Sequence, residues 1–322
     1  MATYYGTYGQ KVQYLASDPS DPQVGQVWYN STSAVLKVRS ATTTGAWASG
    51  GTMGTARYDI GSAGTQTATL AFGGYAPPGG QNAAEAYDGT AWTAVSSLPA
   101  AVFYHAGTGT QTAAISVGGD PAPQRNVTNK WNGSSWTSSG STNSNMRNGG
   151  LTGLQTAALK FGGDSPPNNT QTELYNGTSW TTSPATLNTG RSNLLVSGIG
   201  TQTAALAVGG YTGTPVANVE SYNGTSWTAL TAVPTAIGRN MGSGTQTSAL
   251  TYGDNPTPAK SFLWNGTSWT ATTNLSTPRT SGAGTTAGTQ TSALAAGGYL
   301  TTGVTEEWTG PGVAETRTIT VS

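Results

Sequence analysis

The sequence predicts an all-β chain folded as a closed ring of six four-stranded sheets, and two repeated segments and a missing periodicity support this. A segment of the type Gly-Thr-Gln-Thr-Ala recurs six times, with its glutamines 44 to 47 residues apart. A segment of the type Asn-Gly-Thr-Ser-Trp follows each of the first five copies. No stretch shows the sustained 3.6-residue periodicity of amphipathic helices. Repeats of this length, with four short strands each, are typical of a β-propeller.

Each repeat contains the pattern of a buried strand followed by a hairpin. In the fourth copy, residues 203–208 form a short apolar run that ends at Gly209 and Gly210. Both faces of this run are apolar, as expected for a strand packed between neighbouring sheets. Residues 220–228 then predict a hairpin, with Asn223 and Gly224 in a tight turn of the primed type.

The two ends of the repeat array predict how the ring closes. The last copy has room for three strands, at about 279–308, and lacks the Asn-Gly-Thr-Ser-Trp segment. An unmatched Trp47 lies 45 residues before Trp92. We therefore predict that the strand around Trp47 completes the sixth sheet. One tryptophan per sheet then has a core position: Trp47, Trp92, Trp136, Trp180, Trp227 and Trp269.

The repeat array divides the chain into three parts. Residues 1–40 form an N-terminal segment with apolar runs at Val24–Tyr29 and Ala34–Val38, which predict a short β-hairpin. Residues 41–312 form the six-bladed propeller, and residues 313–322 form a C-terminal tail.

Composition excludes several functions. Lysine and arginine (13) balance aspartate and glutamate (13), so we expect no nucleic-acid partner and no attraction to anionic lipid. The chain has no cysteine and one histidine, His105, so cysteine chemistry and histidine metal sites are excluded, and no metal or other cofactor is expected. Neither an export signal nor a membrane span is visible, so we expect no membrane insertion.

The loops predict one constant and one variable face of the ring. Turns one-to-two and three-to-four, on one face, are nearly identical between repeats. Loops two-to-three and four-to-one, on the other face, vary in length and chemistry. We expect function on the variable face, because binding residues concentrate in loops held by a rigid scaffold. The alternative is neutral drift of these loops.

Arginines recur in the loop that enters the innermost strand of each repeat. We predict that they ring the channel mouth on the variable face and bind carboxylate or phosphate groups of a ligand. The alternative is a structural role, in which each guanidinium binds loop carbonyls. These arginines are Arg57, Arg147, Arg191, Arg239 and Arg279.

Tyrosine or aspartate follows the Gly-Gly pair in five repeats, and in the remaining repeat aspartate follows a single glycine. Aromatic rings stack on sugar faces and carboxylates accept sugar hydroxyls, so these residues predict a glycan-binding surface; they are also ordinary turn residues. They are Tyr75, Tyr211 and Tyr299 in three repeats, and Asp120, Asp164 and Asp254 in the others.

The repeat resembles the kelch repeat. The kelch pattern of arginine, Gly-Gly, glutamate, aromatic and tryptophan is matched by Arg191, Gly209-Gly210, Glu220, Tyr222 and Trp227. The resemblance covers about residues 47–310 and implies the propeller architecture. This repeat is shorter than a usual kelch unit, and its tyrosine-to-tryptophan spacing is five residues.

Residues 20–40 resemble a hairpin module of bacteriophage tail-fibre and other virion proteins, and the propeller repeats also resemble structural proteins of tailed phages. The resemblance implies a virion protein that is assembled in the host cytoplasm and exposed on the particle surface. It would contact other virion proteins through the N-terminal segment and bind a host-surface glycan through the propeller. Further copies of the same chain, in a homo-oligomer, are a candidate partner.

Enzymatic alternatives have weaker support, and we predict a protein that is not an enzyme and has no catalytic residues. Galactose oxidase, a kelch-type copper enzyme, needs histidine ligands and a cysteine that are absent here. Residues 88–92 resemble a sialidase Asp-box, but the spacing differs; Tyr104, Asp120 and Asp164 would be the residues of such a glycosidase. A capsid or tail decoration protein, or a free carbohydrate-binding module, would also agree with the sequence.

Overall fold

The computed structural model describes residues 12–41, 44–164, 167, 169–194, 198–254, 256, 259–299, 303–312 and 314–319. The chain forms two compact units, one of Met1–Gly45 with Thr309–Ser322 and one of Ala46–Trp308. Within the described ranges, no helix has the length and apolar character needed to span a membrane.

The first unit is a small sheet that contains the predicted hairpin. Its strands β2 (Val27–Asn30) and β3 (Val35–Ala41) are antiparallel, and β1 (Gln13–Leu15) pairs in parallel with β2. The C-terminal residues, for which the sequence suggested only a tail, form strand β29 (Ala314–Ile319) on the other side of β3. The carboxylate of Asp18 binds the indole of Trp28 at 3.0 Å and the ammonium of Lys37 at 2.6 Å, which ties the β1–β2 connection to the hairpin.

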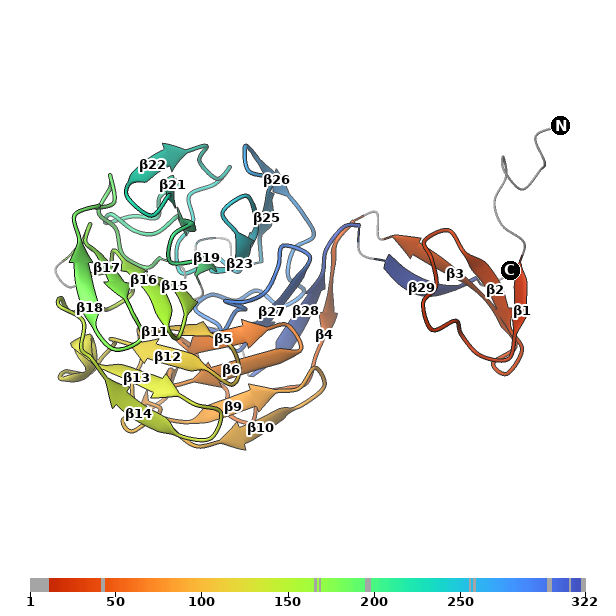
Figure 1. Cartoon of the computed structure of the whole chain (residues 1–322), viewed down its shortest axis with the longest axis horizontal. Coiled ribbons are helices and arrows are strands. Elements are labelled where there is room, and N and C mark those ends of the chain that lie inside the picture. Colours follow the sequence, from red (N-terminus) through yellow and green to blue (C-terminus); the bar gives the residue numbers. More distant parts are fainter. Residues whose placement is uncertain are drawn as a thin grey trace. The chain divides into compact units, whose positions relative to one another are not determined.

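The second unit is a propeller of six sheets around a central channel (Figure 1). Five sheets have four antiparallel strands. Blade one contains β5 (Gly61–Thr65), β6 (Ala68–Phe72), β9 (Ala84–Tyr87) and β10 (Trp92–Val95). Blade two contains β11 (Ala106–Gly109), β12 (Ala114–Val117), β13 (Thr128–Trp131) and β14 (Trp136–Ser139). Blade three contains β15 (Gly150–Leu154), β16 (Ala157–Phe161), β17 (Thr172–Tyr175) and β18 (Trp180–Ser183). Blade four contains β19 (Ile199–Gly200), β20 (Ala205–Val208), β21 (Val219–Tyr222) and β22 (Trp227–Leu230). Blade five contains β23 (Met241–Thr245), β24 (Ser248–Tyr252), β25 (Ser261–Trp264) and β26 (Trp269–Ala271). Loops contain the short pair β7 (Tyr75–Ala76) and β8 (Gly79–Gly80), and the 3-10 turn η1 (Gln124–Asn126).

The sixth sheet closes the ring as predicted. Its strands are β27 (Ser292–Ala296), β28 (Thr305–Thr309) and, from the other end of the array, β4 (Ala46–Ser49). The indole of Trp47 lies 5.3 Å from that of Trp308, and the amide of Gly50 donates to the carbonyl of Thr305 at 2.9 Å. The innermost strand of this blade is reduced to isolated bridges, between Ala283 and Ala296 and between Thr289 and Ser292.

Blades pack face to face through the second strand of each sheet. In β20, Leu206 and Val208 belong to a core cluster with Phe262 of blade five. Ala205 and Ala207 of the same strand belong to a cluster shared with blade three. Both faces of this strand are therefore buried, as the sequence predicted. Burial of this apolar surface between blades is the main term that holds the ring together.

The repeated glutamine joins each blade to the preceding one on the constant face. The side-chain amide of Gln111 donates to the carbonyls of Thr69 (3.2 Å) and Tyr87 (2.6 Å) in blade one. Gln66 does the same across the ring closure, to Ala293 and Trp308 of blade six. The glutamines of blades three to six also donate to carbonyls of the preceding blade. The constancy of this face thus has a structural reason.

The Asn-Gly-Thr-Ser-Trp turn differs from the predicted primed turn. The Asn223 side-chain oxygen accepts hydrogen bonds from the amides of Thr225 and Ser226, both at 2.9 Å. Only Gly224 has positive φ, at 93°. The turn is therefore a four-residue loop between Tyr222 and Trp227, stabilised by the asparagine side chain, and the glycine supplies the left-handed conformation.

Candidate ligand-binding face

Each blade contributes one non-glycine residue in the left-handed backbone conformation to the channel mouth on the variable face. Their φ values lie between 47° and 59°. L-residues other than Asn and Asp rarely adopt this conformation, because the side chain crowds the following carbonyl. The six residues are Asp59, Tyr104, Asn148, Asn193, Arg239 and Ser281. We call them the left-handed ring.

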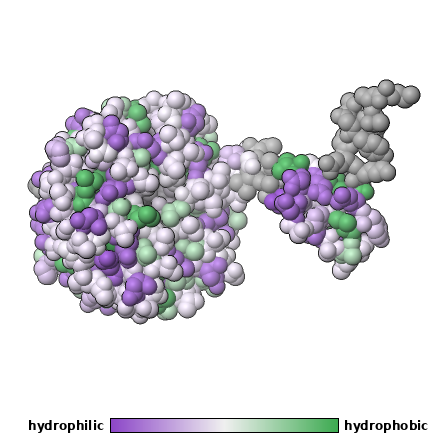
Figure 2. Space-filling model, in the orientation of Figure 1, coloured by the Kyte–Doolittle hydropathy of each residue, from purple (hydrophilic) through white to green (hydrophobic). Residues whose placement is uncertain are grey.

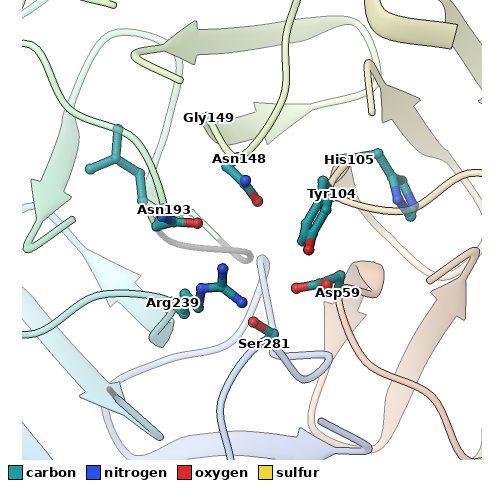
Figure 3. A pocket seen from close by; sticks show the side chains of 9 residues that line it. Asp59, Tyr104, His105, Asn148, Gly149, Asn193, Arg239 and Ser281 are labelled. Atoms are coloured by element: carbon teal, nitrogen blue, oxygen red, sulfur yellow. The ribbon is translucent and has the colours of Figure 1, made fainter. Parts of the chain in front are cut away.

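Backbone hydrogen bonds link this ring from blade to blade. The amide of Asp59 donates to the carbonyl of Ser281 at 2.7 Å, and that of Ser281 donates to Arg239 at 3.0 Å. The amide of Arg239 in turn donates to Asn193 at 2.9 Å. The left-handed conformation lets each loop reach its neighbour, and it aims the six side chains at the axis (Figure 3).

The ring encloses a small pocket rather than an open pore. About 10 Å³ is available to the centre of a water-sized group, which is the space that one water needs. Farther along the channel, the sixth blade has two extra residues between Ser281 and its glutamine. There Ala287 donates to the carbonyl of Gly64, and Thr286 donates to that of Gly109. This segment crosses the channel beneath the pocket.

Asp59 and Arg239 dominate the electrostatics of the pocket. Asp59 is 3% exposed, and burial raises its pKa to about 6, against the opposing effects of the Ser281 hydroxyl and of the Arg239 and Arg147 charges. Its Oδ2 atom has no hydrogen-bond partner among the described residues. The Arg239 guanidinium forms no ion pair with a described residue. A buried carboxyl group with a raised pKa, such as that of Asp59, is typical of functional sites.

The expectation that five arginines ring the mouth is wrong for Arg57, Arg191 and Arg279. All three are at most 2% exposed and lie inside their blades, where each pairs with the glutamate of the third strand. Arg57 pairs with Glu85 at 2.6 Å, Arg191 with Glu220 at 3.1 Å, and Arg279 with Glu306 at 2.5 Å.

Arg191 also donates to the carbonyls of Ala207, Gly209 and Asn218. Its partner Glu220 accepts from the backbone amides of Asn188 and Thr189 in the incoming loop. The contacts of these buried arginines are therefore those of the structural role.

The number of residues between an arginine and the left-handed ring residue of its blade decides whether the arginine is buried or faces the axis. The buried arginines come two residues before the ring position, which points them into the blade. Blades two, three and five have Val102, Met146 and Ile237 there. Blade three keeps its glutamate, Glu173, and pairs it with Lys160 of β16 at 2.5 Å, so the buried charge is still neutralised.

Of the five predicted arginines, Arg147 and Arg239 reach the variable face. Arg147 comes one residue before the ring position and pairs with Asp120 at 2.7 Å and with Asp164 at 3.8 Å. It also lies 4.7 Å over the ring of Tyr104. Arg239 is itself the ring residue of blade five and points into the pocket (Figure 3).

The residues after the glycine pair form a second circle outside the left-handed ring. Tyr75 and Tyr299 form backbone bridges with Tyr58 and Thr280, and Tyr211 does so with Ser192. Asp120 forms a bridge with Phe103, and the amide of Asp164 donates to Arg147. Asp254 takes the place of the second glycine of its pair, one residue before this circle, and is buried at 2% exposure.

Five aromatic rings lie side by side over blades six, one and two. Adjacent ring centroids in this order are 4.9 to 5.4 Å apart: Tyr299, Tyr58, Tyr75, Phe103 and Tyr104. Tyr299 is 50% exposed and the others are half-buried. We call this row the aromatic arc. It includes Tyr75 and Tyr299 of the predicted residues but not Tyr211.

His105 stands apart from the pocket chemistry. It is 3% exposed and packs against Phe72, and Figure 3 shows its ring turned away from the axis. Burial lowers its pKa to about 3. The imidazole is therefore neutral at ordinary pH. Among the described residues, no cluster of three or more His, Cys, Asp or Glu side chains has the arrangement of a metal site.

Sequence reasoning missed most of the left-handed ring and the two arc residues Tyr58 and Phe103. One signal was available. In blades one, two, three and five, the ring residue lies seven residues before the repeated glutamine, as Asp59 does before Gln66. In blades four and six the distance is nine, which hides the correspondence.

Comparison with known proteins adds no relative. No protein-family model matches the chain, and no curated protein matches its sequence.

The molecular surface that Figure 2 shows mixes apolar and polar residues, without one continuous apolar patch.

Proposed function

We propose that this chain is a non-enzymatic virion protein of a tailed bacteriophage, and that its propeller binds a glycan of the host surface. The aromatic arc carries this proposal. Pyranose rings present C–H faces that stack on aromatic side chains, and binding sites combine such surfaces with a few well-placed polar groups.

The arc has the dimensions and neighbours that such a site needs. Its rings are held by packing on one another and by backbone bridges, so little conformational freedom is lost on binding. At one end, Tyr104 contacts Arg147, which is linked to Asp120 and Asp164. At the same end lies the polar pocket. A sugar chain stacked on the arc would thus reach charged and amide groups.

The N-terminal unit has the proposed task of attaching the propeller to other virion proteins. Tyr14 and Val24 are 76% and 60% exposed, and Tyr14 stacks on Tyr29 at 5.2 Å. Exposed apolar side chains on a small sheet suit a protein contact. The phage assignment itself rests on the resemblance of residues 20–40 and of the repeats.

Two matched variants test the glycan proposal. Tyr299→Asp removes an exposed ring of the arc, and Tyr211→Asp makes the same change at the equivalent position outside it. Aspartate is the natural residue there in blades two and three, so both variants should fold. We expect binding to a glycan array and adsorption to host cells to fall at least 10-fold for Tyr299→Asp only.

Three outcomes would contradict the proposal in different ways. Equal binding by both variants would remove the arc from the site. A protein that coats phage particles but binds neither cells nor glycans would instead be a decoration protein. Release of sugars from host polysaccharide would make it a hydrolase.

A further inference from the structure

The side chains of the left-handed ring include hydrogen-bonding groups that the fold leaves without partners among the described residues. Asp59 Oδ2 and Asn193 Oδ1 are buried acceptors without hydrogen-bond partners among the described residues. A buried acceptor left unsatisfied costs about 1–3 kcal/mol. Arg239 offers donors in the same pocket and forms no ion pair with a described residue. The pocket therefore presents unsatisfied acceptors and unused donors to one small space.

The size of the pocket restricts its occupant to a single small group. With about 10 Å³ for the centre of a water-sized group, a sugar ring cannot enter. Farther along the channel, the segment at Thr286 and Ala287 is bonded to the innermost strands of blades one and two. Only one substituent of a ligand that lies on the face above can therefore project into the ring.

We propose that the left-handed ring is a subsite for one hydroxyl group of a neutral sugar, which donates to the Asp59 carboxylate and accepts from the Arg239 guanidinium. The inference rests on the glycan function proposed above. A hydroxyl fits because it supplies one donor and two acceptor lone pairs. A ligand carboxylate would bind Arg239 but would face the oxygens of Asp59 and Asn193, with which it can only repel.

The charge state of Asp59 gives this subsite a pH dependence. The titratable groups around Asp59 are Arg239 from blade five, Arg147 from blade three, Tyr104 from blade two and its own neighbour Tyr58. His105 of blade two also borders the pocket, but its ring is turned away from the axis. His105 is neutral above a pKa of about 3 and does not change charge near pH 6. The pKa of Asp59 lies at about 6, so its carboxylate is lost as pH falls through that value. An accepting carboxylate strengthens a hydrogen bond, so binding of a hydroxyl should weaken on acidification.

The test uses the full chain and an array of neutral hexose oligosaccharides with their deoxy and uronate analogues, at pH values from 4.5 to 8. The variants are Asp59→Asn and Arg239→Asn. Asparagine is the natural ring residue in blades three and four, so it suits the left-handed backbone. The control is Asp88→Asn in the constant-face turn, where four other blades have asparagine.

We expect affinity for neutral oligosaccharides to fall about 10-fold between pH 7.5 and pH 5 in the unchanged chain. Asp59→Asn should bind about 10-fold more weakly at pH 7.5 and lose this pH dependence, and Asp88→Asn should behave as the unchanged chain. The affinity of the unchanged chain for one of the deoxy analogues should also be about 10-fold lower at pH 7.5.

The outcomes separate this inference from the proposed function. Preference for uronates, with binding that strengthens as pH falls, would overturn the hydroxyl subsite and make the pocket a carboxylate site. Binding that depends on Tyr299 but is unchanged in both ring variants would overturn the subsite and keep the glycan function. No binding to any glycan would overturn both.

Discussion

Blades four and five contain the same sequence feature, an arginine in the loop before the innermost strand, and use it in opposite ways. In blade four, Arg191 is fully buried and paired with Glu220. In blade five, Arg239 points into the axial pocket without an ion pair to a described residue. Blade five instead has Ile237 at the buried position, in the same core cluster as Phe262, which replaces the glutamate.

This difference shows that a loop arginine acquires its role from its register to the left-handed residue. Two residues before that position, the side chain enters the blade. At that position it faces the axis. In blade five, Ile237 and Phe262 occupy the positions that Arg191 and Glu220 occupy in blade four. The chain itself therefore contains a natural replacement of the ion pair by an apolar pair.

Breaking the buried pair should have the largest effect. Arg191→Met leaves Glu220, which is 2% exposed, without its cation, and should lower the free energy of unfolding by about 3–5 kcal/mol. Arg191→Ile combined with Glu220→Phe copies blade five and should recover at least half of that loss. Denaturant unfolding measures both. Equal loss in the single and double variants would show that the two blades are not interchangeable.

The buried carboxylate of Asp59 sharpens the comparison, because it lacks the close cation that Glu220 has. Its folded pKa, about 6, lies above the ordinary value of 3.8, so the folded state binds more protons between these values. The contribution of Asp59 to the free energy of unfolding is therefore largest below pH 4 and is lost as pH rises through 6, by about 3 kcal/mol in total. Asp59→Asn should remove this loss.

The measurement is the free energy of unfolding of both proteins from pH 4 to 7. His105 titrates with the opposite sign, since burial lowers its pKa to about 3, but it contributes equally to both proteins and cancels in the difference. A difference that does not change with pH would contradict the raised pKa of Asp59.

The repeated glutamine contacts should make the constant face more sensitive to substitution than the variable face. Gln111→Ala leaves the carbonyls of Thr69 and Tyr87 without their inter-blade donor and should cost about 1–3 kcal/mol. Gln171→Ala is the control, because that glutamine is exposed and lies in a variable-face loop. A similar loss in both variants would mean that the glutamine contacts do not distinguish the faces.

The repeats made the architecture predictable from sequence. Gln66 and Trp47 mark the phase of the first and last sheets, and a ring closes only one way with that phase. The partner of β29 was not predictable in the same manner, because Arg39 and Thr316 meet across 277 residues without a repeated motif.

The site was predictable only in part, since backbone conformation does not follow from residue type alone. Aspartate, tyrosine, asparagine, arginine and serine all occupy the left-handed ring, so no single residue marks it. Tyr75 and Tyr299 were found because they follow the glycine pair. Tyr58 and Phe103 were missed because they precede ring positions that no single residue type marks.

The smallest effect should come from Arg239 itself, and its sign is the opposite of that for Arg191. Left-handed backbone costs an arginine about 1–2 kcal/mol more than it costs glycine, so Arg239→Gly should stabilise the fold by up to about 1 kcal/mol after the greater entropy of the unfolded chain is subtracted. In a protein of this size that is a rise of about 2 °C in the melting temperature. Stabilisation would mean that the arginine is kept at a cost for something other than folding, whereas a fall in melting temperature would give its guanidinium a structural role and remove the contrast with Arg191.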